Sequence, residues 1–339
     1  MTLLSELGAE LPVVAAPMAG GPSTPELVIA AAEAGGLGFL AGGYRTPEQL
    51  AAQISAVSAQ GARCGVNLFV PTPVPVPPGD YAAYRERLLP WAQRHAVELP
   101  ETPQEDDDFW EEKLAVLEEN PVPVVSLTFG LPREAEIRRL RATGAAVLQT
   151  VTSVEEAEQA DLAGVDGLIV QSSAAGGHSG TWTPWSLPAP VELDQLLLHV
   201  RAATDLPLWG AGGISGPEQV QEVLTAGAEG AVVGTALLRS PESGTSPVHQ
   251  AALADPERSS TVVTTAFSGR PARALENGFA AALTGTAPLG FPALHHLTAP
   301  LRKVAAAAGD VEAVNLWAGT GWRQARQEPA GAILRRLAG

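Results

Sequence analysis

The chain has 339 residues, with 21 Lys and Arg against 37 Asp and Glu, which gives a formal net charge of −16 at pH 7. This balance disfavours a nucleic-acid partner, because phosphate backbones attract basic surfaces. Hydrophobic residues make up 45% of the chain and charged residues 17%, and no apolar run reaches the ~18 residues that a membrane-spanning helix needs. We therefore expect a soluble globular protein with no membrane span and no nucleic-acid partner.

The sequence also excludes several kinds of chemistry. The single cysteine, Cys64, can form neither an internal disulfide nor a cysteine zinc site, and the N-terminus lacks the pattern of a secretory signal; both features predict a cytoplasmic protein. Neither lysine, Lys113 or Lys303, follows a glycine, so no GxxxxGK phosphate loop exists, and no GxSxG nucleophile elbow occurs. We interpret the acidic run 105–108 as a solvated helix start and predict no metal site.

Eight short runs are rich in Val, Leu and Ala and show no polar alternation, which is typical of parallel strands buried on both faces. They begin near Val13, Leu37, Ala62, Val122, Ala145, Asp166, Leu206 and Gly230.

Helix signals separate these runs. Capping-box patterns, in which two side chains satisfy free backbone N–H groups, occur at Thr46–Gln49, Ser153–Glu156 and Ser215–Glu218, and Thr24 followed by Pro25 gives a further start. Glycines that can adopt the left-handed conformation follow the predicted helices and end them, at Gly35, Gly61, Gly144, Gly164 and Gly227.

Strands alternating with helices form either a doubly wound sheet or a closed barrel, and eight units within residues 1–240 favour the (β/α)₈ barrel, an α/β fold. Insertions after the third and sixth strands are predicted to build the pocket walls, because the loops after the strands carry the active site in such barrels. The first insertion opens with the polyproline-like run 71–78 and continues with helices near 80–95 and 105–119. We predict that 241–322 form a small helical appendage on the substrate side, and that 323–339 return to the barrel as a closing helix.

Glycines follow the last two predicted strands, in WGAGGIS (209–215) and VVGT (232–235). Backbone N–H groups beside glycines can approach an anion closely, so this pair of motifs predicts a phosphate site where barrels commonly place one. A dinucleotide-binding GxGxxG motif fails because Ser215 occupies its third glycine position. The alternative is that these glycines serve only tight turns.

Carboxamides lie at the ends of two other strands, Asn67 in NLFVP and Gln149 in LQTVTS. A buried carboxamide costs about 1 to 3 kcal/mol unless its donors and acceptors are paired. Each therefore bonds either backbone or a bound polar ring, and the edge of a flavin would be a suitable partner.

The sixth strand leads into the glycine-rich loop QSSAAGGHSGTWTPW (171–185), which carries His178. A histidine on the catalytic rim can exchange a proton near neutral pH or stabilise an anion. Trp182 and Trp185 either wall an apolar pocket or pack under the loop.

These motifs together resemble the FMN-dependent nitronate monooxygenases, formerly called 2-nitropropane dioxygenases. The resemblance covers about residues 12–280 and rests on ordered motifs, which are PVVAAPMAGG, LGFLAGGY, GVNLFVP, TFG, LQTV, AAGGHSG, AGGI and GT.

The resemblance implies FMN as cofactor and gives each motif a role. It implies that Ala16, Pro17 and Met18 lie against the isoalloxazine ring, that Asn67 and Gln149 hydrogen-bond it, and that Gly177 packs nearby. It further implies that the phosphate is held by Gly212, Gly213, Val233, Gly234 and Thr235, and that His178 is the catalytic residue.

The implied reaction is the oxidation of an alkyl nitronate, or of a nitroalkane such as a 3-nitropropionate-like compound, by O₂ to a carbonyl compound and nitrite.

The chain departs from the family at Ser179, where an arginine is frequent, so a positive charge for an anionic substrate is expected to be missing. An enoyl-acyl-carrier-protein reductase using FMN and NAD(P)H, an NAD(P)H:quinone reductase and a non-catalytic FMN-binding barrel are the alternatives, and the oligomeric state is left open.

Overall fold

The computed structural model describes residues 1–187 and 189–339. Eight parallel strands form a closed barrel, as predicted, because β1 pairs with β2 on one side and with β9 on the other. Each strand begins at its predicted start or at most two residues after it. The barrel strands are β1 (Val13–Ala15), β2 (Leu37–Ala41), β3 (Cys64–Phe69), β4 (Val124–Thr128), β5 (Ala146–Val151), β6 (Gly167–Gln171), β8 (Leu208–Ala211) and β9 (Gly230–Val233).

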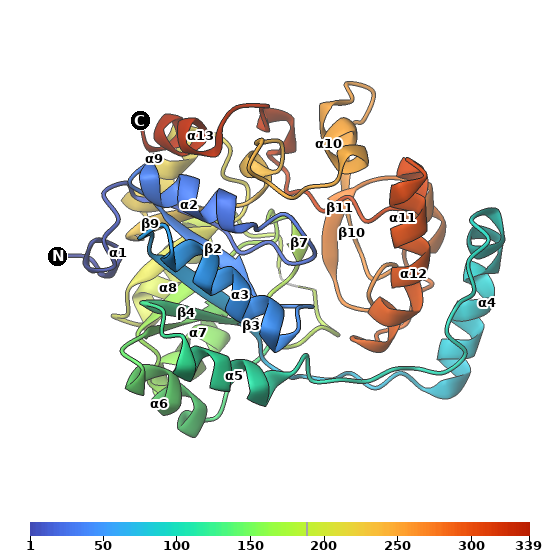
Figure 1. The fold of residues 1–339 in the computed structure, drawn as a ribbon, viewed down its shortest axis with the longest axis horizontal. Helices are drawn as coiled ribbons and strands as arrows, with labels where there is room; N and C mark the ends of the chain where they lie inside the picture. The colour runs from blue at the N-terminus through green and yellow to red at the C-terminus, as the bar shows by residue number, and fades with distance from the viewer. Residues whose placement is uncertain (188) are drawn as a thin grey trace.

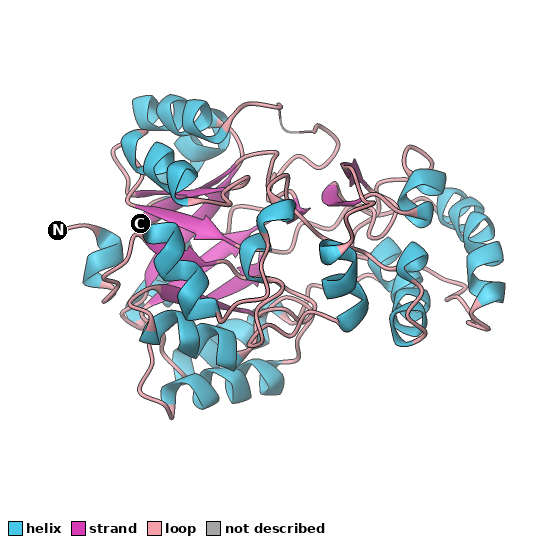
Figure 2. Cartoon of the chain, turned by 90° about the horizontal axis from the view of Figure 1, so that it is seen from above, coloured by secondary structure: helices cyan, strands magenta, loops and turns pink. Residues whose placement is uncertain are grey.

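Helices surround the barrel, which occupies one half of the molecule (Figures 1 and 2). The C-terminal helix packs against α2, α9 and β1, and so fills the eighth helical position. It begins at Ala330 and not at residue 323, since Pro329 cannot continue a helix toward its N-terminus. The outer helices are α2 (Pro25–Glu33), α3 (Pro47–Ser58), α5 (Trp110–Glu119), α6 (Glu134–Ala142), α7 (Val154–Ala163), α8 (Leu193–Ala203), α9 (Pro217–Thr225) and α13 (Ala330–Ala338).

The predicted helix caps are confirmed in part. Thr24 caps α2, and Thr46 forms a complete capping box with Gln49 at the start of α3. Ser153 caps α7, but the Glu156 carboxylate bonds elsewhere. The box predicted at Ser215 is wrong: α9 begins after Gly216 without a side-chain cap, because Pro217 fixes the first helical residue.

The interior of the barrel is filled at one end only. Phe39 and Trp209 meet edge to face with ring centroids 6.2 Å apart, and Leu4 and Leu7, within and just after the short helix α1 (Leu3–Glu6), join the same apolar cluster. This packing closes the amino ends of the strands. A ligand site in the barrel therefore has to lie at the carboxyl ends.

A second unit covers the carboxyl ends (Figure 1). It has its own apolar cluster, to which Tyr81 and Tyr84 of the first insertion and Phe267, Phe279 and Leu297 of the appendage contribute. Its elements are α4 (Pro78–Arg94), α10 (Pro247–Ala254), α11 (Gly278–Leu283), α12 (Ala293–Ala307) and a small antiparallel sheet of β10 (Thr261–Thr264), β11 (Ala272–Leu275) and β7 (Gly177–His178).

Two features of this unit differ from the sequence prediction. The segment 241–322, which we predicted as a small helical appendage, contains two strands, β10 and β11, as well as helices. Their sheet is completed by β7, about 90 residues earlier in the chain, so its pairing is non-local. In addition, α4 packs on α12, although it lies within the 1–240 segment that we assigned to the barrel.

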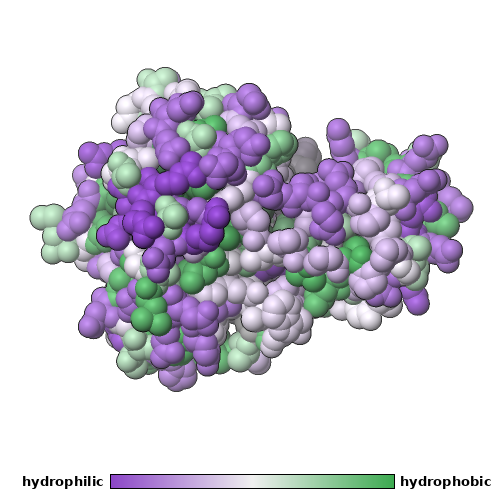
Figure 3. Space-filling view, turned by 90° about the horizontal axis from the view of Figure 1, so that it is seen from below, coloured by the Kyte–Doolittle hydropathy of each residue, from purple (hydrophilic) through white to green (hydrophobic). Residues whose placement is uncertain are grey.

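Seen as a surface, the molecule has two lobes joined by a narrower waist, and hydrophilic residues cover much of the barrel lobe on this face (Figure 3). Among the described residues, no helix combines the length and the apolar character that crossing a membrane requires.

Candidate active site

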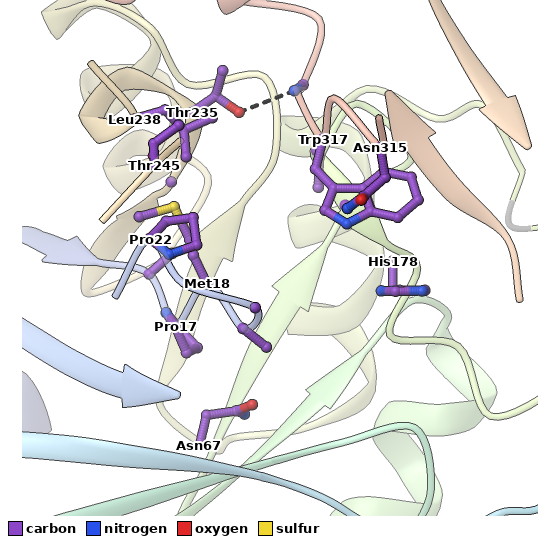
Figure 4. A pocket seen from close by; sticks show the side chains of 18 of the residues that line it. Pro17, Met18, Pro22, Asn67, His178, Thr235, Leu238, Thr245, Asn315 and Trp317 are labelled. Atoms are coloured by element: carbon purple, nitrogen blue, oxygen red, sulfur yellow. Dashed lines mark hydrogen bonds between the residues drawn. The ribbon is translucent and has the colours of Figure 1, made fainter. Parts of the chain in front are cut away.

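A cavity of about 610 Å³ lies at the carboxyl ends of the barrel strands, beneath the second unit. Residues of β3 and residues that follow β1, β8 and β9 form one side, and α12 with the segment 314–321 forms the other. Figure 4 shows Met18 and Asn67 on the barrel side, with His178, Asn315 and Trp317 on another side of the same space. A volume of this size accommodates a cofactor-sized ligand.

The structure brings eleven of the twelve predicted site residues to this cavity, although they come from five separate segments of the chain. Those that line it are Ala16, Pro17, Met18, Asn67, Gly177, His178, Gly212, Gly213, Val233, Gly234 and Thr235.

Gln149 does not line the cavity. Its side chain is fully buried on the outer face of β5, where Nε2 donates to the carbonyl oxygens of Leu127 (3.2 Å), Gly130 (3.1 Å) and Thr150 (3.2 Å). Thr150, the next residue, faces the cavity instead, because side chains alternate between the faces of a strand. Of the two tryptophans, Trp182 packs against the barrel core and Trp185 is exposed, and neither lines the cavity.

Asn67, in the second half of β3, is held by the neighbouring strand β4. Its Nδ2 donates to the Ser126 carbonyl (3.1 Å), to Ser126 Oγ (2.9 Å) and to Thr128 Oγ1 (3.0 Å). These bonds use the amide nitrogen and fix the plane of the carboxamide. The amide oxygen can then accept a hydrogen bond from a ligand in the cavity.

Glycines after β8 and β9 form a concave backbone surface. Gly212 and Gly213 have positive φ values of +113° and +75°. A Cβ on Gly212 would lie 2.6 Å from Ser172 Oγ, and a Cβ on Gly234 would lie 3.4 Å from Met18 Sδ. Only glycine fits at Gly212, which leaves backbone N–H groups open to an anion.

Thr235 completes this surface. Its Oγ1 accepts a hydrogen bond from Gly319 N at 2.9 Å (Figure 4). Since that bond uses a lone pair, the hydroxyl proton remains free to donate. Glycine backbone and a hydroxyl donor form the donor set that a phosphate requires, so the residues present fit the phosphate of a mononucleotide.

His178 lies on β7, which pairs with β11. Its Nε2 is 2.8 Å from Ser268 Oγ, and its ring contacts those of Phe129, Phe291 and Trp317, with centroids 5.8, 5.9 and 5.2 Å away. Burial lowers the pKa of His178 to about 3, with smaller contributions from two nearby guanidinium groups. The imidazole is therefore neutral at physiological pH and keeps one N–H donor and one lone pair.

The backbone after His178 is fixed by side chains from two other elements. Gln171, at the end of β6, accepts from Gly180 N (2.7 Å) and donates to the His178 carbonyl (3.3 Å). The buried carboxylate of Glu156 accepts from Thr181 Oγ1 (3.0 Å) and from Trp182 N (2.7 Å). The loop that carries the imidazole is thus held in one conformation before any ligand binds.

Comparison with known proteins agrees with this geometry. The nitronate monooxygenase family model matches residues 2–338. This chain belongs to the nitronate monooxygenase family. It is therefore an oxidoreductase of a flavoprotein family.

Relatives match over nearly the whole chain. A probable nitronate monooxygenase of Staphylococcus aureus (strain Newman) is 33% identical over 99% of this chain and 95% of its own length. One of Bacillus subtilis (strain 168) is 33% identical over 94% of this chain and 92% of its own length. Crystal structures of nitroalkane oxidase from Streptomyces ansochromogenes match with a TM-score of 0.94 at 44% identity, covering 99% of this chain and 97% of that one. FabK from Thermotoga maritima matches with a TM-score of 0.78 at 25% identity, covering 99% and 94%.

Two arginines were missed by the sequence analysis. Arg302 on α12 lines the cavity, and Arg270, in the turn between β10 and β11, donates to the carbonyls of Ser179 and Thr181, with its guanidinium 4.0 Å from the centre of the Phe129 ring. The expectation that Ser179 leaves the site without a positive charge is therefore wrong. Both arginines lie about 90 or more residues from Ser179 in sequence, and no local pattern marked them.

Proposed function

We propose that this member of the nitronate monooxygenase family uses FMN to oxidise alkyl nitronates with O₂, giving a carbonyl compound and nitrite. The proposal rests on three features that line one cavity at the carboxyl end of the barrel. They are the glycine cradle formed by Gly212, Gly213 and Gly234, the Asn67 carboxamide and the neutral imidazole of His178. The small molecules involved are the nitronate or nitroalkane and O₂. We also propose a cytoplasmic location, on the basis of the single, buried thiol of Cys64.

The chain offers a specific place for each part of FMN. Gly212, Gly213, Gly234 and Thr235, with Val233 beside them, would hold the phosphate. The backbone of Ala16, Pro17 and Met18 would lie against the ring system, with Gly177 nearby, and Asn67 Oδ1 would accept from its polar edge. Gln149 would act only indirectly, by holding the carbonyls of β4 and β5 in place.

Bound FMN would supply the redox chemistry, by accepting electrons from the substrate and passing them to O₂. The protein contributes binding and orientation. The N–H of neutral His178 would donate to the nitronate oxygens, and its lone pair would accept the α-proton where a neutral nitroalkane is the substrate. Phe129, Phe291 and Trp317 pack around the imidazole and reduce its contact with water.

The experiment is a pair of assays on purified protein. We expect yellow protein that releases nitrite from ethyl nitronate in air without any nicotinamide. Colourless protein that does not bind added FMN would contradict the cofactor. NADH-dependent reduction of an enoyl thioester or of a quinone, without nitrite release from nitronate, would instead support one of the two reductase alternatives.

A further inference from the structure

The charge of the cavity is opposite to that of the chain. Among the described residues that line it, the ionisable side chains are Tyr44, three histidines, Arg302 and Lys303, and no Asp or Glu is present, although the chain carries a net charge of −16. Lys303 is exposed, whereas Arg302 is half-buried. Such an uncompensated cation favours an anion in the cavity.

Arg302 is oriented only by neutral groups. Its Nε donates to Thr298 Oγ1 (3.0 Å), Nη1 to Asn315 Oδ1 (3.0 Å) and Nη2 to the His295 carbonyl (3.1 Å). Among the described residues no carboxylate lies within 4.0 Å of it, since none of the ion pairs includes Arg302. The guanidinium is therefore preorganised, and its charge is left for a ligand.

Arg302 lies in the same wall of the cavity as the groups around the imidazole. Its partner Asn315 is two residues from Trp317, whose ring contacts His178, and both side chains lie above His178 in Figure 4. Its other partner, His295, stacks on the Tyr44 ring with centroids 4.1 Å apart. The Tyr44 hydroxyl is buried and has no hydrogen-bond partner among the described residues.

We propose that Arg302 is the specificity-determining residue that neutralises the negative charge of the substrate, so that the enzyme distinguishes a nitronate from the nitroalkane of the same carbon skeleton. This inference rests on the proposed function. The family frequently has an arginine after the histidine, where this chain has Ser179. We assign the positive charge to Arg302 on α12 instead. This assignment also accounts for a half-buried guanidinium that has no carboxylate partner in the described part of the chain.

The test compares ethyl nitronate with nitroethane, which differ by one proton and are otherwise matched. Replacing Arg302 by Met should raise KM for ethyl nitronate about 10- to 100-fold, the usual effect of losing a charge-assisted hydrogen bond. KM for nitroethane should change less than about 3-fold. Arg302→Lys keeps the charge but not the planar guanidinium. Its KM for ethyl nitronate should lie between those of wild type and Arg302→Met.

The control is Arg201→Met on α8. This arginine also donates only to neutral oxygens, those of Leu206 and Thr204, but it does not line the cavity. It should leave both KM values unchanged while removing the same net charge. An equal increase in KM for both substrates in Arg302→Met would overturn the specificity role. Loss of bound FMN from that variant would also overturn it.

A binding measurement separates this inference from the proposed function. Anaerobic titration of the yellow protein with nitrate, a planar anion that is not turned over, should give a Kd about 10- to 100-fold weaker in Arg302→Met. Failure of wild type to turn over either nitro substrate would refute the proposed function alone. Equal nitrate affinity in wild type and Arg302→Met would refute the role of Arg302.

Discussion

The imidazole of His178 and the hydroxyl of Ser268 join two distant parts of the chain, with Nε2 and Oγ 2.8 Å apart. Ser268 lies in the turn between β10 and β11, and its Oγ also lies 3.3 Å from the Arg270 carbonyl. A serine hydroxyl both donates and accepts, so Ser268 can bond His178 in either neutral tautomer. The turn between β10 and β11 thus orients a side chain that lies 90 residues earlier in the chain, on the neighbouring strand β7 of the same small sheet.

Removing the Ser268 hydroxyl should therefore impair the orientation of His178. We expect Ser268→Ala to bind FMN normally and to lose about 5-fold in kcat/KM for nitronate, corresponding to a hydrogen bond of ~1 kcal/mol. Ser268→Thr keeps the hydroxyl and should retain most of the activity. Steady-state nitrite release, with absorbance spectra for FMN content, measures both, and full activity in Ser268→Ala would contradict this role.

Replacing His178 tests the proposed catalytic group itself. His178→Ala should remain yellow but lose about 10²- to 10⁴-fold in turnover, the usual contribution of a positioned acid or base. The FMN spectrum and nitrite release under saturating nitronate provide the measurement. Unchanged turnover with bound FMN would show that the imidazole takes no part in the reaction.

Gln171 should matter through the two hydrogen bonds that it makes on either side of Ser179. Gln171→Glu keeps an acceptor for Gly180 N, whereas Gln171→Met keeps the size and loses both bonds. We expect kcat to fall by roughly 5-fold and 30-fold respectively, because each lost hydrogen bond costs about 1 kcal/mol in holding the loop in its productive conformation. The reverse ranking, or a change confined to KM, would argue against positioning of His178.

The glycine cradle can be tested with a matched pair of substitutions. Gly212→Ala should weaken FMN binding at least about 10-fold, because the residue has a φ of +113° and its Cβ would lie 2.6 Å from Ser172 Oγ. Gly144→Ala introduces comparable backbone strain, at a φ of +91°, with nothing within 4 Å of the Cβ. Fluorescence titration with FMN should therefore show weaker binding for Gly212→Ala alone. Gly144→Ala should lower Tm and leave FMN binding unchanged.

Three enclosed histidines predict a loss of stability in mild acid. Burial lowers the pKa of His178 to about 3 and of His249 to about 4, and it lowers that of His295 well below its usual value. Below about pH 6.5 the unfolded chain binds protons that the folded protein does not, so stability falls as pH falls from 6.5 toward 4, by up to ~1.4 kcal/mol per pH unit for each histidine.

His249 allows this pH effect to be tested outside the proposed chemistry. His249→Asn keeps a side-chain donor close to that of Nδ1 and removes the titration. Urea unfolding between pH 4 and pH 7 should then show a shallower pH dependence than wild type. A slope identical to that of wild type would contradict a neutral, buried His249 in the folded protein.

The sequence alone determined the order of strands and helices and most of the site. Parallel strands buried on both faces are continuous apolar runs, and side chains at the strand ends must meet at one rim of a barrel. Asn67, His178 and Thr235 could therefore be assigned to a single site from their positions along the chain. The Thr46 cap followed from local hydrogen bonding, which needs no tertiary contact.

Tertiary structure decided the rest. The lack of polar alternation that identifies a doubly buried strand also hides which residues face inward, so the sequence could not show that Thr150 rather than Gln149 faces the cavity. Arg302 and Ser268 reach the site only because the second unit folds back over the barrel. Such contacts depend on packing between segments far apart in the chain, and no local periodicity encodes them.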